Sequence, residues 1–168
     1  MEKASVDRNQ FFSSLVIRVT TIAVATLILF NQDLVPRMPP KVKEFKAKIK
    51  AADAILIATP EYNYSVPGVL KNAIDWASRP YEDNSFNDKP VAIMSASIGI
   101  LGGARAQYHL RQIFVTLNMH CINKPEVFVA FADQKIDKRG RVKDEQTREK
   151  IRELVENLVT WARKLKAS

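Results

Sequence analysis

The segment AILIATPEYNYSVPGVLKNAIDW, residues 54–76, indicates the fold class of this chain most clearly. It opens with the continuous apolar run Ala54–Thr59, which is typical of a strand buried on both faces of a parallel sheet. A short polar loop follows, and Pro67 then stands where the first turn of a helix accepts a proline. Apolar side chains recur at helical spacing from Val69 to Trp76. The stretch therefore predicts a strand, a loop and a helix, in that order.

A helix is predicted before this stretch, and the order of strand, loop and helix recurs after it. Upstream, apolar residues recur at helical spacing after the pair Pro39-Pro40, which suits the start of a helix. They predict a helix over Arg37–Ala52. Downstream, the predicted elements are a strand at Pro90–Ser97, a helix at Ala104–Leu117, a strand at Glu126–Phe131 and a final helix at about residues 143–165. Strands and helices that alternate at these lengths predict one α/β domain over residues 1–168, with an open parallel sheet covered by helices on both faces.

The composition is that of a globular protein and argues against a nucleic-acid-binding module. The chain has 168 residues, of which 46% are hydrophobic and 26% charged, enough for one domain with its own core. The formal charge of +8 comes from 26 basic against 18 acidic residues. The basic residues are interspersed with acids, and no stripe of basic and aromatic residues accompanies them. A nucleic-acid-binding module therefore ranks last among the functions considered, and no nucleic acid is expected as a partner.

Cysteine and histidine usage argues against a disulfide and against a metal site. Cys121 is the single cysteine, so no internal disulfide can form. This favours a reducing compartment or says nothing about the redox state, and a cytoplasmic location is predicted. His109 and His120 do not belong to a pattern of His, Cys and carboxylate residues at metal-ligand spacing. No bound metal is therefore expected.

The largely apolar segment Phe11–Phe30 raises the question of a membrane anchor. Arg18 interrupts it, and its most apolar part, Val19–Phe30, is too short to span a bilayer. Its many β-branched residues suit a buried strand better. We therefore expect no membrane partner, and an anchor formed by residues 11–30 is the weaker alternative.

Two loops are expected to form the ligand site. In open parallel sheets, ligands bind outside the carboxyl ends of the strands. Pro60–Ser65 and Ser97–Gly103 each follow a predicted strand and precede a predicted helix, so backbone N–H groups from both loops can face one ligand. The glycines at 99, 102 and 103 are predicted to let the backbone approach a flat ring closely.

The residue types in the first loop suit an aromatic ligand. Tyr62 and Tyr64 can shield the face of a ring, while Asn63 and the backbone of Glu61 can hydrogen-bond heteroatoms at its edge. The alternative is an ordinary turn, in which Asn63 and Ser65 satisfy nearby backbone groups. The loop alone leaves both interpretations open.

Three segments resemble the NADPH-dependent FMN reductase family, which includes chromate reductases, quinone reductases and azoreductases. They are ATPEYNYSVPGVLKNAIDWASRP at 58–80, SASIGILGGARAQYHLR at 95–111 and NKPEV at 123–127, and the resemblance extends over about residues 29–166. It implies a flavodoxin-like, three-layer α/β/α fold and non-covalently bound FMN. It also implies hydride transfer from NAD(P)H to the flavin, followed by electron transfer to quinone, azo or metal-oxyanion acceptors.

The resemblance also implies roles for individual residues. The flavin ring would be bordered on one side by Pro60, Glu61, Tyr62 and Asn63, and on the other by Ser97, Gly99 and Gly102. Tyr64 is added to these cofactor-binding residues because its ring can shield the flavin. Arg105, Tyr108 and Glu126 match positions that join subunits in similar proteins, so dimers or tetramers are implied. No catalytic acid or base is expected, because the flavin carries the chemistry.

The N-terminus departs from the family pattern. Relatives begin with a strand and a phosphate loop of the form Gly-Ser-Leu-Arg-x-x-Ser-x-Asn. When the Gly-Ser pair is aligned with Ala4-Ser5, Asp7 takes the arginine position, so Ser5 and the neighbouring Arg8 are left as the expected phosphate contacts.

The family's first strand has no counterpart in this alignment and is absent or replaced. The candidates to replace it are Phe11–Val19 and Thr21–Phe30, and a disrupted start over residues 1–30 is the other explanation. A non-catalytic flavodoxin-like protein with a degenerate phosphate site therefore stands as the alternative function.

Overall fold

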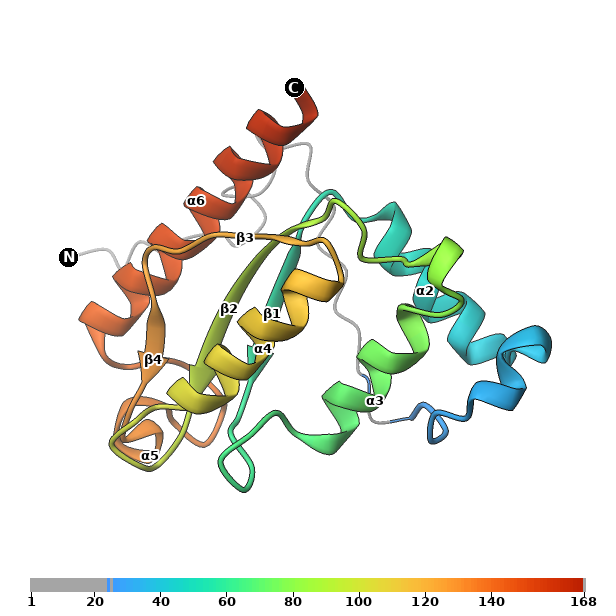
Figure 1. Ribbon diagram of the computed structural model, residues 1–168. Coiled ribbons are helices and arrows are strands. Elements are labelled where there is room, and N and C mark those ends of the chain that lie inside the picture. The colour runs from blue at the N-terminus through green and yellow to red at the C-terminus, as the bar shows by residue number, and fades with distance from the viewer. Residues whose placement is uncertain (1–23, 25, 168) are drawn as a thin grey trace.

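The computed structural model describes residue 24 and residues 26–167, whose strands form one parallel sheet (Figure 1). Strand β2 (Pro90–Ala96) lies at its centre. Strand β1 (Ile55–Thr59) pairs in parallel with one edge of β2. The short strands β3 (His120–Cys121) and β4 (Val127–Val129) pair in parallel with its other edge, β3 near the start of β2 and β4 near its end. The predicted parallel sheet is confirmed.

Helices cover both faces of this sheet, as predicted. The residues of β2 alternate between the faces, as the period of a strand requires. Val91 and Ile93 join the larger core cluster with α2, α3 and α4, whereas Ala92 and Met94 join a second cluster with α6. The helices and short helical turns are η1 (Gln32–Arg37), α2 (Pro40–Ala51), α3 (Gly68–Ala77), η2 (Tyr81–Asp83), α4 (Ala104–Thr116), α5 (Ala132–Lys135) and α6 (Glu145–Ala167).

The ends of the elements differ from the prediction for local reasons. Helix α2 starts at Pro40 rather than at residue 37, because a proline suits the first helical position and η1 occupies the residues before it. Helix α6 starts after Asp144, whose carboxylate accepts from the backbone N–H of Thr147 at 2.8 Å and so caps the first turn. The predicted strand 126–131 is shortened to β4, because Phe131 takes a left-handed backbone conformation and starts α5.

Strand β1 is less buried than predicted, and this prediction is wrong for one of its faces. Ile55 and Ile57 pack against the larger core cluster. Leu56 and Ala58 point to the other face, where both are exposed and Leu56 keeps 38% of its surface. The cause is the placement of α6, whose core residues pack over β2 and β4. In the described part of the chain, no strand pairs with the outer edge of β1.

The segment before η1 is held against α3 without forming a strand. Residue 24 and residues 26–30 form turns and irregular structure, so at these residues Thr21–Phe30 does not replace the family's first strand. The Ile28 carbonyl accepts from the Trp76 indole at 2.8 Å. Phe11–Val19, Ser5 and Arg8 lie outside the described residues. Among the helices that the structure describes, none is long and apolar enough to cross a membrane.

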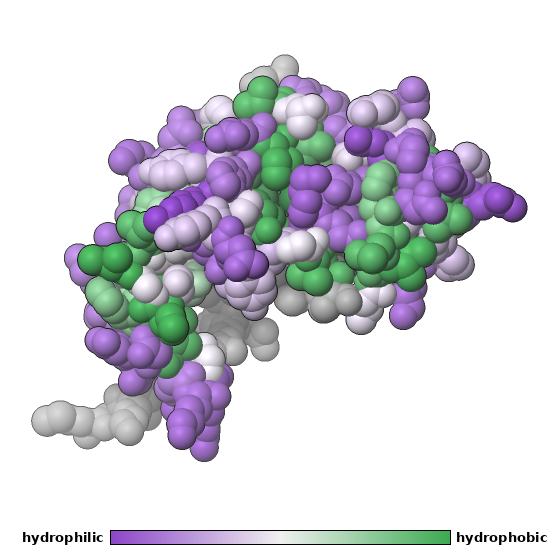
Figure 2. Space-filling view, turned by 60° about the horizontal axis from the view of Figure 1, so that its bottom comes forward, coloured by the Kyte–Doolittle hydropathy of each residue, from purple (hydrophilic) through white to green (hydrophobic). Residues whose placement is uncertain are grey.

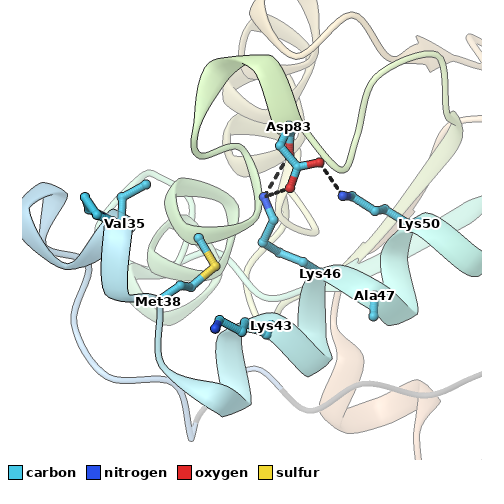
Figure 3. A pocket seen from close by; sticks show the side chains of 8 residues that line it. Val35, Met38, Lys43, Lys46, Ala47, Lys50 and Asp83 are labelled. Atoms are coloured by element: carbon cyan, nitrogen blue, oxygen red, sulfur yellow. Dashed lines mark hydrogen bonds and ion pairs between the residues drawn. The ribbon is translucent and has the colours of Figure 1, made fainter.

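A buried lysine joins α2 to the segment that follows α3 (Figure 3). Lys46 is 5% exposed, and its ammonium donates to the carbonyls of Ala77 at 3.2 Å, Asp83 at 2.8 Å and Arg79. It also pairs with the Asp83 carboxylate at 3.4 Å, and Lys50 reaches the same carboxylate. Burial lowers the pKa of Lys46, and Asp83 opposes this effect. A hollow of about 300 Å³ opens beside this group, far from the loops described next.

Candidate functional site

The two loops predicted to bind a ligand lie at the same end of the sheet. Pro60–Ser65 follows β1 and Ser97–Gly103 follows β2, so parallel pairing places both at the carboxyl edge (Figure 1). Figure 2 turns this end forward and shows areas of apolar surface separated by hydrophilic side chains. The prediction that the loops share one edge is therefore confirmed.

The first loop contains a tight turn in an uncommon conformation. Tyr62 and Ser65 exchange two backbone hydrogen bonds, of 3.1 and 3.0 Å. Between them, Asn63 has φ 50° and Tyr64 has φ 62°. Two consecutive positive φ values define a type I′ turn. Asn adopts this conformation readily, whereas a bulky side chain such as that of Tyr64 does so at a cost in free energy.

Glu61 ties this loop to the start of α4. One carboxylate oxygen accepts from the backbone N–H groups of Arg105 at 2.9 Å and Ala106 at 3.2 Å, and the other pairs with the Arg105 guanidinium at 3.1 Å. Gly103 at the N-cap has no side chain to satisfy these donors. A carboxylate is also favoured at the positive end of the helix dipole. The carboxylate is thus engaged within the protein, so any contact of Glu61 with a ligand falls to its backbone, as the sequence predicts.

Two further side chains of α4 contact the turn. The Arg105 guanidinium lies over the Tyr64 ring, 3.8 Å from its centre. One helical turn later, Nδ1 of His109 is 2.9 Å from the Ser65 hydroxyl. The sequence reasoning missed the His109 contact, and the spacing of four residues between Arg105 and His109 on one helix face was the available signal. A groove of about 390 Å³ beside this contact is lined by Ser65, Val66, Lys71, His109, Gln112, Ile113 and Thr116.

The second loop is attached to α4 through buried polar groups. The Ser95 hydroxyl donates to the carbonyl of Gly102 at 2.6 Å. The fully buried Gln107 amide donates to Ser95 at 2.8 Å and to the carbonyl of Val127 at 2.9 Å. Helix α4 therefore supports both loops, and β4 is joined to the same network. At the tip of the loop, the N–H of Gly99 donates to the Ser97 hydroxyl at 3.1 Å.

The glycines of the second loop have different roles. Gly102 has φ 57°, and a Cβ there would lie 2.8 Å from backbone atoms of Phe128 and Ala130. Gly103 has φ 88°, and its Cβ would lie 2.7 Å from that of Ser95. At both positions, contacts within the protein itself require glycine, independently of the predicted approach to a ring. At Gly99 an added Cβ would meet only the Ser97 hydroxyl, at 3.6 Å, so this glycine borders open space.

The chemistry of the edge suits a flat ring with acceptor atoms on its rim. Tyr62, Tyr64, Ile98 and Ile100 each leave at least 60% of their surface exposed there. Among the described residues, the backbone N–H groups of these loops at 63, 64, 98 and 100 have no acceptor. Exposed apolar surface and backbone donors without a protein acceptor together match an isoalloxazine, which has flat faces and carbonyl oxygens. Within residues 24 and 26–167, no group of three His, Cys, Asp or Glu side chains is placed to hold a metal ion.

The residues predicted to join subunits have different contact partners in this structure. Arg105 contacts Glu61 and Tyr64 of its own chain. Tyr108 is 49% exposed, and its ring centre lies 6.2 Å from that of Phe128. In the described part of the chain, no hydrogen bond or ion pair joins Arg105, Tyr108 and Glu126. Their role between subunits stays a prediction.

The fold defines a flavodoxin-like α/β protein, and the carboxyl edge of its sheet carries the exposed aromatic and apolar side chains described above. Among solved structures, a WrbA-like flavodoxin from Agrobacterium tumefaciens shares the fold, with a TM-score of 0.55 at 17% identity over 81% of this chain and 94% of that one. The FerB flavoenzyme NAD(P)H:(acceptor) oxidoreductase from Paracoccus denitrificans has a TM-score of 0.76 at 37% identity, over 84% of this chain and 78% of that one.

The chain belongs to the NADPH-dependent FMN reductase family, whose sequence profile matches residues 8–134. An NAD(P)H-dependent FMN reductase of Pseudomonas aeruginosa is 51% identical over 144 residues, which are 85% of this chain and 77% of the relative. An NAD(P)H:quinone oxidoreductase of Solanum tuberosum is 48% identical over 149 residues, 86% of this chain and 75% of the relative. The predicted family, the fold class and the class of flavin-dependent oxidoreductase are confirmed.

Proposed function

We propose that this protein binds FMN at the carboxyl edge of its sheet and uses NAD(P)H to reduce quinones. The observation that carries the proposal is the pair of loops supported by α4. Their exposed tyrosine rings and their backbone N–H groups without a protein acceptor suit an isoalloxazine. The similar proteins include an FMN reductase, quinone oxidoreductases and a 2-hydroxy-1,4-benzoquinone reductase. Bound FMN accepts a hydride and passes on electrons, and the protein supplies binding and orientation.

The residues on the two loops take the following parts in this proposal. The backbone of Pro60 and Glu61 and the amide of Asn63 face the rim of the ring, while Tyr62 and Tyr64 cover one of its faces and keep water away. Ser97 and Gly99 border the opposite side, and Gly102 gives that loop its shape by packing on β4. Ser5 and Arg8 are proposed to contact the phosphate. No side chain is assigned a proton transfer.

A quinone is the acceptor we favour over azo compounds and metal oxyanions. The rim of the edge carries the exposed apolar side chains of Tyr62, Ile98 and Ile100. Such a surface favours a flat, mainly apolar molecule that stacks over the flavin. A metal oxyanion would gain little from this surface, because it is small, charged and strongly hydrated.

The proposal also includes the oligomeric state and the cellular location of the protein. The half-exposed Tyr108 is available to a second subunit, so with Arg105 and Glu126 it is proposed to contribute to a dimer or tetramer. The single cysteine, Cys121, is free and partly buried, which supports a cytoplasmic location.

Flavin binding and turnover test the function together. The purified full-length protein is titrated with FMN and, separately, with riboflavin, and NAD(P)H oxidation is followed with FMN and a benzoquinone present. We expect a bound-flavin spectrum, ping-pong kinetics and tighter binding of FMN than of riboflavin. Equal, weak binding of both ligands without turnover would favour the non-catalytic alternative with a degenerate phosphate site. Absence of any flavin binding would contradict both.

A further inference from the structure

The turn Tyr62–Ser65 is held in a conformation that its sequence does not favour by itself. Tyr64 is left-handed at φ 62°, next to Asn63 at φ 50°. A type I′ turn usually carries glycine at its second central position, which here is Tyr64. The aromatic side chain therefore stands at a position where the free chain would often choose another conformation, and contacts elsewhere have to stabilise the turn.

Helix α4 provides these contacts from a single face. The Arg105 guanidinium covers the Tyr64 ring at 3.8 Å, and the same side chain pairs with Glu61 at 3.1 Å just before the turn. His109 lies one helical turn further on and meets the Ser65 hydroxyl at 2.9 Å, at the residue that closes the turn. Arg105 thus contacts a central residue of the turn, and His109 contacts its last residue.

We propose that Arg105 and His109 are positioning residues that hold the strained turn Tyr62–Ser65 in the conformation that meets the flavin ring. The inference rests on the proposed function, because it assigns the turn to the flavin. It gives Arg105, a predicted interface residue, an additional role within its own subunit. It gives His109 a role as a hydrogen-bond partner, which involves neither a metal nor proton transfer.

Hydrogen exchange in flavin-free protein tests whether these side chains stabilise the turn. The amides of Tyr62 and Ser65 donate the two hydrogen bonds of the turn, so their exchange rates report its opening. In His109→Ala we expect both amides to exchange about three- to tenfold faster, as the loss of one exposed hydrogen bond implies. Ser65→Ala removes the other partner and should give the same increase for Tyr62. The matched control is Val115→Ala on the exposed side of α4, with unchanged exchange.

Relief of the strain separates positioning from general stabilisation. Tyr64→Gly suits the left-handed conformation, so it should stabilise the turn and offset the loss of the His109 contact. The double variant Tyr64→Gly, His109→Ala should therefore exchange its Ser65 amide within about twofold of the wild-type rate. A double variant that exchanges as fast as His109→Ala alone would overturn the proposal.

Riboflavin affinity tests the link to the flavin, because riboflavin lacks the phosphate and reports the ring contacts alone. We expect His109→Ala and Arg105→Gln to weaken riboflavin and FMN by the same factor, about three- to tenfold. Arg105→Lys keeps the charge but loses the planar contact with Tyr64, and should fall between wild type and Arg105→Gln. Faster exchange with unchanged riboflavin affinity would overturn this inference alone. A wild-type protein that binds no flavin would overturn the proposed function and the inference with it.

Discussion

Replacement of Glu61 is the sharpest test of how the two loops are supported. The carboxylate accepts from two backbone N–H groups in the first turn of α4 and pairs with the Arg105 side chain, and Glu61 is only 12% exposed there. A side-chain cap is worth about 0.5–2 kcal/mol, and a negative charge at a helix N-terminus about 0.3–1 kcal/mol. Glu61→Ala loses both and should lower the free energy of unfolding by about 2 kcal/mol. Glu61→Gln keeps an acceptor oxygen and should lose about 1 kcal/mol.

Urea unfolding of flavin-free protein measures these differences. The midpoint should fall in the order wild type, Glu61→Gln, Glu61→Ala, with an unchanged slope, because the folded structure buries the same surface. Glu149→Ala on the exposed face of α6 is the control and should stay within about 0.5 kcal/mol of wild type. If Glu61→Ala unfolds at the same urea concentration as Glu149→Ala, the carboxylate does not cap α4 and the account of the loops is wrong.

Three other predictions concern the fold and the glycine loop. Lys46→Met leaves buried carbonyls without a donor and should lower the free energy of unfolding by about 3 kcal/mol; a loss below about 1 kcal/mol in urea unfolding would contradict this. Gly102→Ala should cost about 2 kcal/mol or more through its clash with β4, whereas Gly99→Ala should leave stability unchanged and weaken riboflavin in a fluorescence titration. The hydrogen bond from Lys50 lowers the pKa of Asp83 below its ordinary value of 3.8, so its contribution is present above about pH 4 and is lost as the pH falls through the lowered pKa. Thermal melts of wild type and Asp83→Asn should therefore differ at neutral pH and converge in acid.

The order of the elements and the position of the site could be predicted because both follow from local patterns. The apolar run Ala54–Thr59 and the helical spacing after Pro67 describe a strand and a helix without tertiary information. Parallel pairing then places the ends of successive strands at one edge, so Pro60–Ser65 and Ser97–Gly103 had to lie together. The resemblance to the family added the identity of the ligand.

The remaining features depend on contacts between elements. The exposure of Leu56 is decided by where α6 packs, and periodicity within one strand does not report that. The left-handed conformation of Tyr64 is not favoured by its residue type. The side chains that contact this turn, Arg105 and His109, come from α4 and not from the neighbouring sequence. The sequence predicts that Gly102 approaches a ring, whereas the neighbour that the structure shows to require glycine there is β4, more than twenty residues further along the chain.

The uncovered flank of β1 bears on how this protein behaves in concentrated solution. In the described part of the chain, the strand ends the sheet on that side and exposes Leu56 and Ala58, and it carries no charged side chain and no proline. Strand edges that lack such protection are the places where chains pair with one another and aggregate. Because β1 leads directly into the turn at Tyr62–Ser65, self-association along this edge would also disturb the loop that we propose to bind the flavin. If chains pair along the outer edge of β1, solubility and cofactor binding are therefore expected to decline together.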